Sequence, residues 1–166
     1  MAQALFITSK DIKQFTAMNG NIDPDVFVQW IKIAQDLHIQ GYLGTKLFNK
    51  INDDIVSGTL ANPYLALLNT YIKPMVIHWS MVQYLPFGAY TLANKGFYKH
   101  SSETSESMTK AEVDMLVEKE RDIAQSYTQR FLDYMCYNYT DFPEWTANVD
   151  NDVRPNKDTN FSGWVL

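Results

Sequence analysis

Apolar residues recur every three or four positions along three long stretches of this chain, and this spacing constrains the fold more than any other feature. The stretches cover residues 24–40, 63–85 and 109–138. Because an α-helix repeats every 3.6 residues, such spacing gathers the apolar side chains on one side of a helix. The sequence therefore predicts an all-α fold, a helical bundle of three long helices with short helices between them.

Each long stretch begins at a helix-capping signal. Asp23 and Asn62 each precede a proline, which places a capping side chain just before a residue whose missing N–H costs nothing in the first turn. Thr109 and Glu112 form a capping box, in which each side chain bonds the backbone N–H of the other residue. This box is the best single indication of a helix start in the chain.

Glycine and proline mark where the predicted helices bend or end. Gly41 and Gly44 are expected to end the first long helix in left-handed geometry, before a shorter helix from Thr45 to about Val56. Pro74 lies inside the second long stretch, where it removes the bond to the Thr70 carbonyl and bends the helix.

Shorter elements complete the prediction. Thr8 or Ser9 can cap a short helix over residues 10–15, residues 94–96 form a turn, and residues 97–99 form a brief strand. The predicted organisation has three parts: an N-terminal arm at 1–8, a bundle domain at 9–138 with an exposed loop at 101–108, and an extended, irregular C-terminal tail at 139–166.

Charge is distributed unevenly along the chain. The whole chain has 14 basic and 19 acidic side chains, a net charge of −5. Residues 1–100 hold 8 basic and 6 acidic side chains (net +2), whereas residues 101–166 hold 6 basic and 13 acidic ones (net −7). This asymmetry suits head-to-tail contacts between copies or a partner bound at one end. It equally suits a solvated acidic helix face followed by a tail.

No residue pattern is specific to catalysis. Cys136 is the only cysteine, and a lone cysteine is usually a small buried hydrophobic residue. No local signature supports its pairing with His38, His78 or His100. His78, next to Trp79, is expected to be a hydrogen-bonded core or interface histidine. We expect no enzymatic activity, no catalytic residue and no cofactor.

Metal binding has no better support. The three histidines are far apart in sequence, without a second ligand at helical spacing. Asp150, Asp152 and Asp158 invite comparison with a calcium-binding EF-hand loop. A loop beginning at Asp150 would place Arg154 fifth and Phe161 twelfth, where oxygen ligands are required. We therefore expect no metal site, and an exposed acidic tail is the simpler interpretation.

Neither nucleic acid nor a membrane is a predicted binding target. Lysines in the first part of the chain are too sparse to grip DNA, although they can line a surface past which DNA moves: Lys46, Lys50, Lys95 and Lys99. Pro74 to Asn94 contains no charged residue and is long enough to span a bilayer. Its prolines, its histidine and its charged flanks favour a buried, kinked helix instead.

The two ends of the chain are the best candidates for contact with another protein. The N-terminal arm is short and apolar, and the apolar side chains of the aromatic C-terminal segment would each gain about 2 kcal/mol from burial in a neighbour's groove. The alternative is that the tail folds back onto its own bundle. The predicted partner-binding residues are Leu5, Phe6, Ile7, Phe161, Trp164, Val165 and Leu166.

Several short motifs follow one another over residues 4–143. They are Leu5–Thr8, Ile33–Ile39, Tyr42–Phe48, Tyr71–Pro74, Tyr84–Pro86 and Asn94–Gly96, the last of which precedes a Ser/Glu-rich loop. Together they resemble the small helical head–tail connector proteins of tailed phages, particularly those of crAss-like and related Bacteroidetes phages. The motifs are structural rather than catalytic.

This resemblance implies a structural virion protein. Such connector (neck or adaptor ring) proteins form a homo-oligomeric ring, twelvefold by resemblance, that docks on the portal protein and extends the DNA channel. The ring provides the attachment surface for further neck or tail ring proteins, and genomic DNA passes through it without sequence-specific binding. The expected location is the neck of the virion, after assembly in the cytoplasm of the bacterial host.

The arm and tail residues would then contact the portal or a neighbouring subunit, while the channel-facing residues stay unassigned. The alternative is a small monomeric or dimeric adaptor or regulatory domain that binds one phage or host protein.

Overall fold

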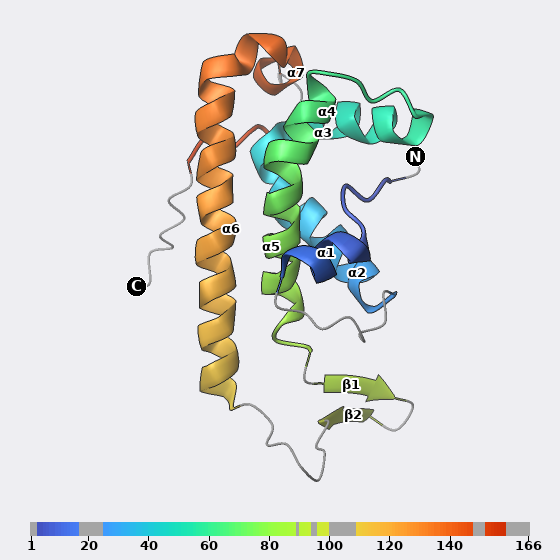
Figure 1. Ribbon diagram of the computed structural model, residues 1–166, viewed down its shortest axis with the longest axis vertical. Coiled ribbons are helices and arrows are strands. Elements are labelled where there is room, and N and C mark those ends of the chain that lie inside the picture. The colour runs from blue at the N-terminus through green and yellow to red at the C-terminus, as the bar shows by residue number, and fades with distance from the viewer. Residues whose placement is uncertain are drawn as a thin grey trace.

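The chain forms a helical bundle with one short β-hairpin, which confirms the predicted all-α class (Figure 1). The computed structural model describes residues 3–16, 25–88, 90–93, 96–99, 109–147 and 152–158. The helices and strands are α1 (Ser9–Phe15), α2 (Asp25–Ala34), η1 (Gln35–Ile39), α3 (Gln40–Ser57), α4 (Tyr64–Leu67), η2 (Leu68–Ile72), α5 (Lys73–Tyr84), β1 (Tyr90–Ala93), β2 (Gly96–Lys99), α6 (Lys110–Asn138), η3 (Tyr139–Asp141) and α7 (Pro143–Thr146).

The first predicted long helix belongs to a longer helical run with a kink. α2 passes through the π-helical turn η1 into α3, and Gly44 has a non-helical φ of 73° and ψ of 155°. Glycine adopts a positive φ without the steric cost that a Cβ imposes. The predicted break is confirmed at Gly44, whereas Gly41 stays helical.

The second predicted long helix is present as α4, η2 and α5. Pro74 lies in the first turn of α5 and follows the π-helical turn η2, in which the Lys73 N–H bonds the Leu68 carbonyl five residues back. The predicted disturbance at Pro74 therefore takes the form of a widened turn. The predicted cap at Asn62 is wrong, because α4 begins only at Tyr64 and Pro63 occupies the N-cap position without a side-chain bond.

The capping signals elsewhere predict the helix starts correctly. Thr109 and Glu112 form the expected capping box at the start of α6, which ends at Asn138 as predicted. Thr8 caps α1 in the same way, with Asp11 as its partner. Both boxes involve residues only three positions apart, so the chain can form them before any long-range contact. The cap predicted at Asp23 and the loop predicted at 101–108 lie outside the described residues.

A short antiparallel hairpin follows α5. β1 pairs with β2 in the register Tyr90 with Lys99 and Ala93 with Gly96. The brief strand predicted at residues 97–99 is thus confirmed, with a second strand beside it. No described helix has both the length and the apolar character that a membrane span requires.

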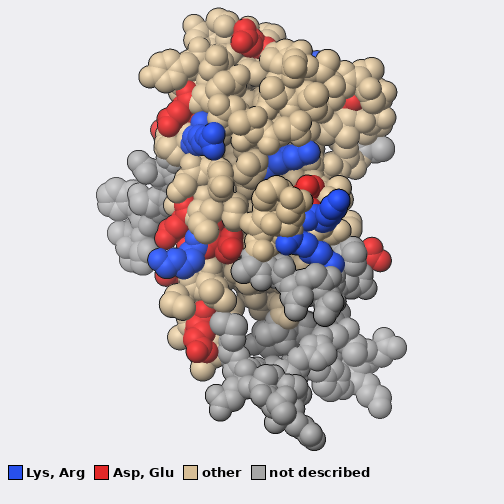
Figure 2. All heavy atoms as spheres, viewed as in Figure 1, with Lys and Arg blue, Asp and Glu red and all other residues tan. Residues whose placement is uncertain are grey.

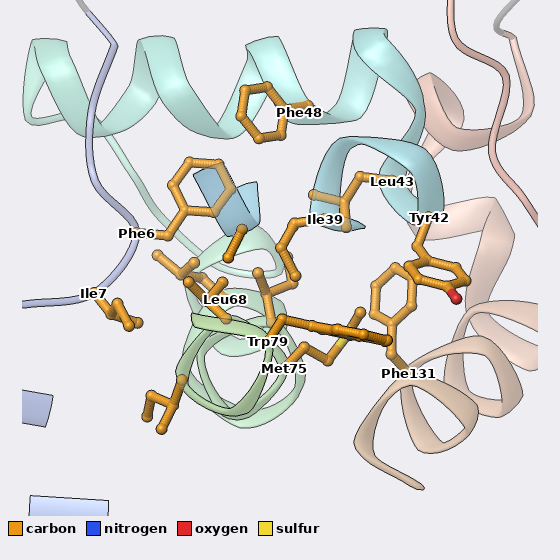
Figure 3. Packing of buried hydrophobic residues seen from close by; sticks show 14 of the residues in the cluster. Phe6, Ile7, Ile39, Tyr42, Leu43, Phe48, Leu68, Met75, Trp79 and Phe131 are labelled. Carbon is orange, nitrogen blue, oxygen red and sulfur yellow. The ribbon is translucent and has the colours of Figure 1, made fainter. Parts of the chain in front are cut away.

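Helices α5 and α6 pack side by side in antiparallel directions and carry much of the core (Figure 1). Tyr71 near the start of α5 stacks on Tyr134 near the end of α6, with ring centroids 4.3 Å apart. Further along, the Trp79 indole N–H donates to Thr128 Oγ1 at 3.2 Å. Figure 3 shows Trp79 reaching across the core toward Tyr42 and Phe131. These contacts join the kinked α2–α3 run to the α5–α6 pair.

The N-terminal arm packs onto its own bundle. Phe6 and Ile7 are buried, and the Phe6 ring lies 5.0 Å from that of Phe48 between centroids (Figure 3). The buried Gln35 side chain holds the arm's backbone, accepting from the Phe6 N–H at 2.7 Å and donating to the Ala4 carbonyl at 3.1 Å. The arm is therefore part of the core of this chain.

The first part of the predicted tail is also structured, so its predicted boundary at residue 139 needs correction. Residues 139–146 form η3 and α7, and Phe142 and Trp145 are buried. The Trp145 indole N–H donates to the Tyr42 carbonyl at 3.1 Å. Two large aromatic side chains close in sequence can bury themselves without a long periodic stretch, and for this reason periodicity does not reveal them. The bundle extends to residue 147.

Candidate functional site

The residues predicted to bind partners are divided between the core and the undescribed end. Phe6 and Ile7 are buried in the chain's own core, and only Leu5 is half exposed. Phe161, Trp164, Val165 and Leu166 lie outside the described residues. Their partner-binding role stays a prediction, and the structure does not bring the arm residues together on an open surface.

The histidine predicted to lie in the core does so. His78 is nearly buried, its Nδ1 lies 2.7 Å from Glu120 Oε2, and its ring stacks on Tyr127. By contrast, Cys136 is exposed, which corrects the expectation of a buried thiol. It occupies the solvent-facing side of α6 near the helix end. Within the described residues, no group of three His, Cys, Asp or Glu side chains could hold a metal ion.

A cavity of about 570 Å³ opens beside the kink in the α2–α3 run, and we call it the kink pocket. Four separate parts of the chain form it: the turn before the kink, α5, α6 and the C-terminal segment 152–158. The residues that line it are Leu37, His38, Gly41, Tyr42, Trp79, Arg121, Gln125, Val153, Arg154 and Asn156. Its size is typical of ligand sites in proteins.

Residues 152–158, which we call the strap, form one wall of the kink pocket and are bound directly to the kink. In a regular helix, the Thr45 N–H would donate to the Gly41 carbonyl four residues back. Here the Thr45 N–H donates to the Val153 carbonyl at 3.0 Å, and the Gly41 carbonyl accepts from the Asn156 N–H at 2.8 Å. The strap therefore supplies both hydrogen-bond partners that the kink removes.

The strap also fits the kink sterically. A Cβ built on Gly44 would lie only 2.7 Å from Cγ and Cδ of Pro155. Further along, the Lys157 ammonium lies 4.8 Å from the centre of the Trp145 ring. Gly44 is thus required twice, first for its positive φ and second for the close approach of Pro155.

Stacked rings form the inner side of the kink pocket. The His38 and Trp79 rings lie 4.0 Å apart between centroids and are nearly parallel, at 13°. His38 Nε2 lies 2.9 Å from the Gln83 side-chain nitrogen, so the amide N–H₂ can donate to an unprotonated ring nitrogen. Because Trp79 is itself held by Thr128, these rings are fixed by α5 and α6 together.

The pocket is electropositive. Burial, together with the smaller effect of the nearby positive charge of Arg121, lowers the pKa of His38 from its ordinary value of 6.5 to about 4. His38 is therefore uncharged at neutral pH. Arg121 and Arg154 carry the positive charge, and the described lining contains neither a carboxylate nor a thiol. The arrangement suits the binding of an anion with an apolar part.

The sequence does not predict this pocket. His38 enters the prediction only as a rejected partner of Cys136 and a rejected metal ligand, and no role is predicted for Arg121 or Arg154. One compositional signal was available: only three of the 14 basic residues are arginines, and two of the three line the pocket. No spacing in the sequence could have indicated that residues 38, 79, 121 and 154 meet.

Comparison with known protein families gives a match for this chain. A family model described as a family of unknown function (DUF6712) matches residues 39–155, more than half of the chain. The chain belongs to this family. The matched range includes both the kink at Gly44 and the strap as far as Pro155. No match was found among curated proteins or solved structures.

Proposed function

We propose that this protein is a structural subunit of a head–tail connector ring, which docks on the portal protein of a tailed phage and extends its DNA channel. The observation that carries the proposal is the placement of exposed apolar side chains at opposite ends of the bundle. Phe87 follows α5 and is 52% exposed, whereas Tyr137 near the end of α6 is 88% exposed. Since α5 and α6 are antiparallel, these residues mark opposite ends.

Further exposed apolar residues lie between these ends. Leu37 beside the kink pocket is 65% exposed and Met115 on α6 is 55% exposed. Single exposed apolar residues are common on monomers. A ring subunit, however, needs contact surfaces toward two neighbours and toward the components above and below it. Apolar side chains on several separate faces support that arrangement.

The charge of α6 supports contacts between unlike faces. On the face shown in Figure 2, acidic side chains gather over α6, with some basic side chains among them. α6 holds 6 acidic and 4 basic side chains, whereas residues 1–100 carry more basic than acidic ones. In a head-to-tail ring, an acidic face of one copy can meet a more basic face of the next.

The decisive experiment measures mass by light scattering, for the purified chain alone and then with the portal protein encoded by the same genome. A closed oligomer of defined size, or a portal complex of fixed stoichiometry, is expected. Removing residues 157–166 should leave a folded helical domain, verified by circular dichroism, but should weaken this association. A monomer that ignores the portal would contradict the proposal.

The alternative function, a monomeric or dimeric adaptor domain, is favoured by the kink pocket. An adaptor needs one accessible groove rather than several contact faces, and the pocket provides a groove with apolar and cationic walls. The same light-scattering experiment separates the two functions. A stable monomer that captures one protein through this pocket supports the adaptor and excludes the ring.

A further inference from the structure

We infer that the kink pocket is a recognition site for an acidic peptide: Arg121 and Arg154 bind the carboxylate of an Asp or Glu side chain, and an apolar residue beside that side chain packs on Leu37 and Val153. This inference is independent of the proposed ring, because it concerns the chemistry that the pocket accepts rather than the assembly that uses it.

The first argument is that both guanidinium groups lack an anionic partner within the described part of the chain. Arg121 comes from the middle of α6 and Arg154 from the strap, and neither takes part in an ion pair there. Glu118 and Asp122 are close to Arg121 along α6 but form no ion pair with it. Two cations from distant segments therefore line one cavity, and neither is paired with a carboxylate of the described residues.

The second argument is that the cations are arginines. All eight basic residues in positions 1–100 are lysines, yet both basic residues of the pocket are arginines. A guanidinium is planar and donates two parallel hydrogen bonds to a carboxylate, whereas an ammonium acts as a point charge. This chemistry favours a planar carboxylate as the ligand.

The third argument concerns the rest of the lining. His38 remains uncharged at neutral pH, so it adds no third cation that would favour a doubly charged phosphate. Leu37 and Val153 are 65% and 40% exposed at the pocket, where they offer an apolar surface outside the charged part. An acidic side chain followed by an apolar one matches both surfaces, and a peptide supplies the two at a fixed separation.

The test uses the three arginine side chains as reporters. Because the chain has only Arg121, Arg130 and Arg154, its side-chain Nε–H NMR spectrum holds three signals, which single Arg-to-Lys variants assign. Arg130 lies over the Tyr71 ring, away from the pocket, and serves as the internal control. The full-length protein is titrated with the dipeptide acetyl-Glu-Leu-amide, which serves as the probe.

The expected result is a saturable shift of the Arg121 and Arg154 signals, with the Arg130 signal unchanged. The neutral dipeptide acetyl-Gln-Leu-amide should bind at least about tenfold more weakly, because its side-chain amide carries no negative charge to pair with the two guanidinium groups. Arg121→Gln or Arg154→Gln should weaken binding of the acidic dipeptide by a similar factor, whereas Arg130→Gln should leave it unchanged.

Three outcomes would overturn the inference. Equal shifts at all three arginines would show unspecific charge attraction. Equal affinity for the neutral dipeptide would show an apolar site only. Tighter binding of inorganic phosphate than of the acidic dipeptide would show a phosphate site. Each outcome leaves the mass of the assembled protein unaffected, so the test is separate from that of the ring.

Discussion

Gly44 is the single residue on which the kink and the strap both depend. Replacing it with alanine puts a side chain at a φ of 73° and within 2.7 Å of Pro155. We expect Gly44→Ala to lower the free energy of unfolding by about 2 kcal/mol or more, measured by urea denaturation. Gly41→Ala is the matched control, because a Cβ there has nothing within 4 Å. It should be neutral or slightly stabilising, and equal losses in both variants would contradict this account.

His38 makes a residue-scale prediction about pH. Its folded pKa of about 4 lies below the ordinary value of 6.5, so the unfolded chain binds the proton more tightly. The stability contributed by the uncharged ring is complete above pH 6.5 and is lost as the pH falls from 6.5 toward 4. The expected loss is about 2 kcal/mol, after allowing for the partial exposure of the ring.

The measurement compares urea denaturation of the wild type and of His38→Gln across that pH range. The variant should lose less stability between pH 6.5 and 4, since the carboxylates that titrate there are common to both proteins. Arg121→Gln should raise the pKa of His38 in an NMR titration, because it removes the neighbouring positive charge. An unchanged slope in His38→Gln would contradict the prediction.

At the scale of elements, the strap supplies the hydrogen-bond partners that the Thr45 N–H and the Gly41 carbonyl would have in a regular helix. Asn156→Pro removes the N–H that bonds the Gly41 carbonyl, and it also removes the side-chain oxygen that accepts from the Asp158 N–H. We expect a loss of about 1 kcal/mol and reduced hydrogen-exchange protection at the Thr45 amide, which the strap covers. The amides of α6 near Phe131 provide the reference, since their protection should not change. Retained protection at Thr45 would show that the strap is not needed there.

The elements also show which features a sequence reveals. The boxes at Thr8 and Thr109 were predictable because capping depends on residues three positions apart. The break at Gly44 was predictable as a break, but its hydrogen bonds were not, because their partners lie more than a hundred residues further along. The kink pocket was unpredictable for the same reason. Its side chains meet only after the strap, α5 and α6 have packed.

At the scale of the whole molecule, segments near both ends of the described chain pack into one hydrophobic core. The arm contributes Phe6 and Ile7 on one side, and the segment after α6 contributes Phe142 and Trp145 on the other. All four belong to the same buried cluster. The apolar character of the arm indicated burial. Burial in a neighbouring subunit and burial in the chain's own core, however, require the same apolar residues. The structure assigns the arm to its own bundle.

Phe6 and Phe15 allow a direct test of this assignment. Phe6 is 3% exposed and packs on Phe48, whereas Phe15 at the end of α1 is 59% exposed. We expect Phe6→Ala to cost about 3 kcal/mol and to lower the melting temperature of the entire bundle, because it leaves a cavity in a shared core. Phe15→Ala should change the melting temperature little.

Circular dichroism at the helix band, with tryptophan fluorescence as a second probe, should show one coincident transition in both variants. If Phe6→Ala melts like the wild type, the arm is not a structural part of the core. It would then again be available for contact with a partner.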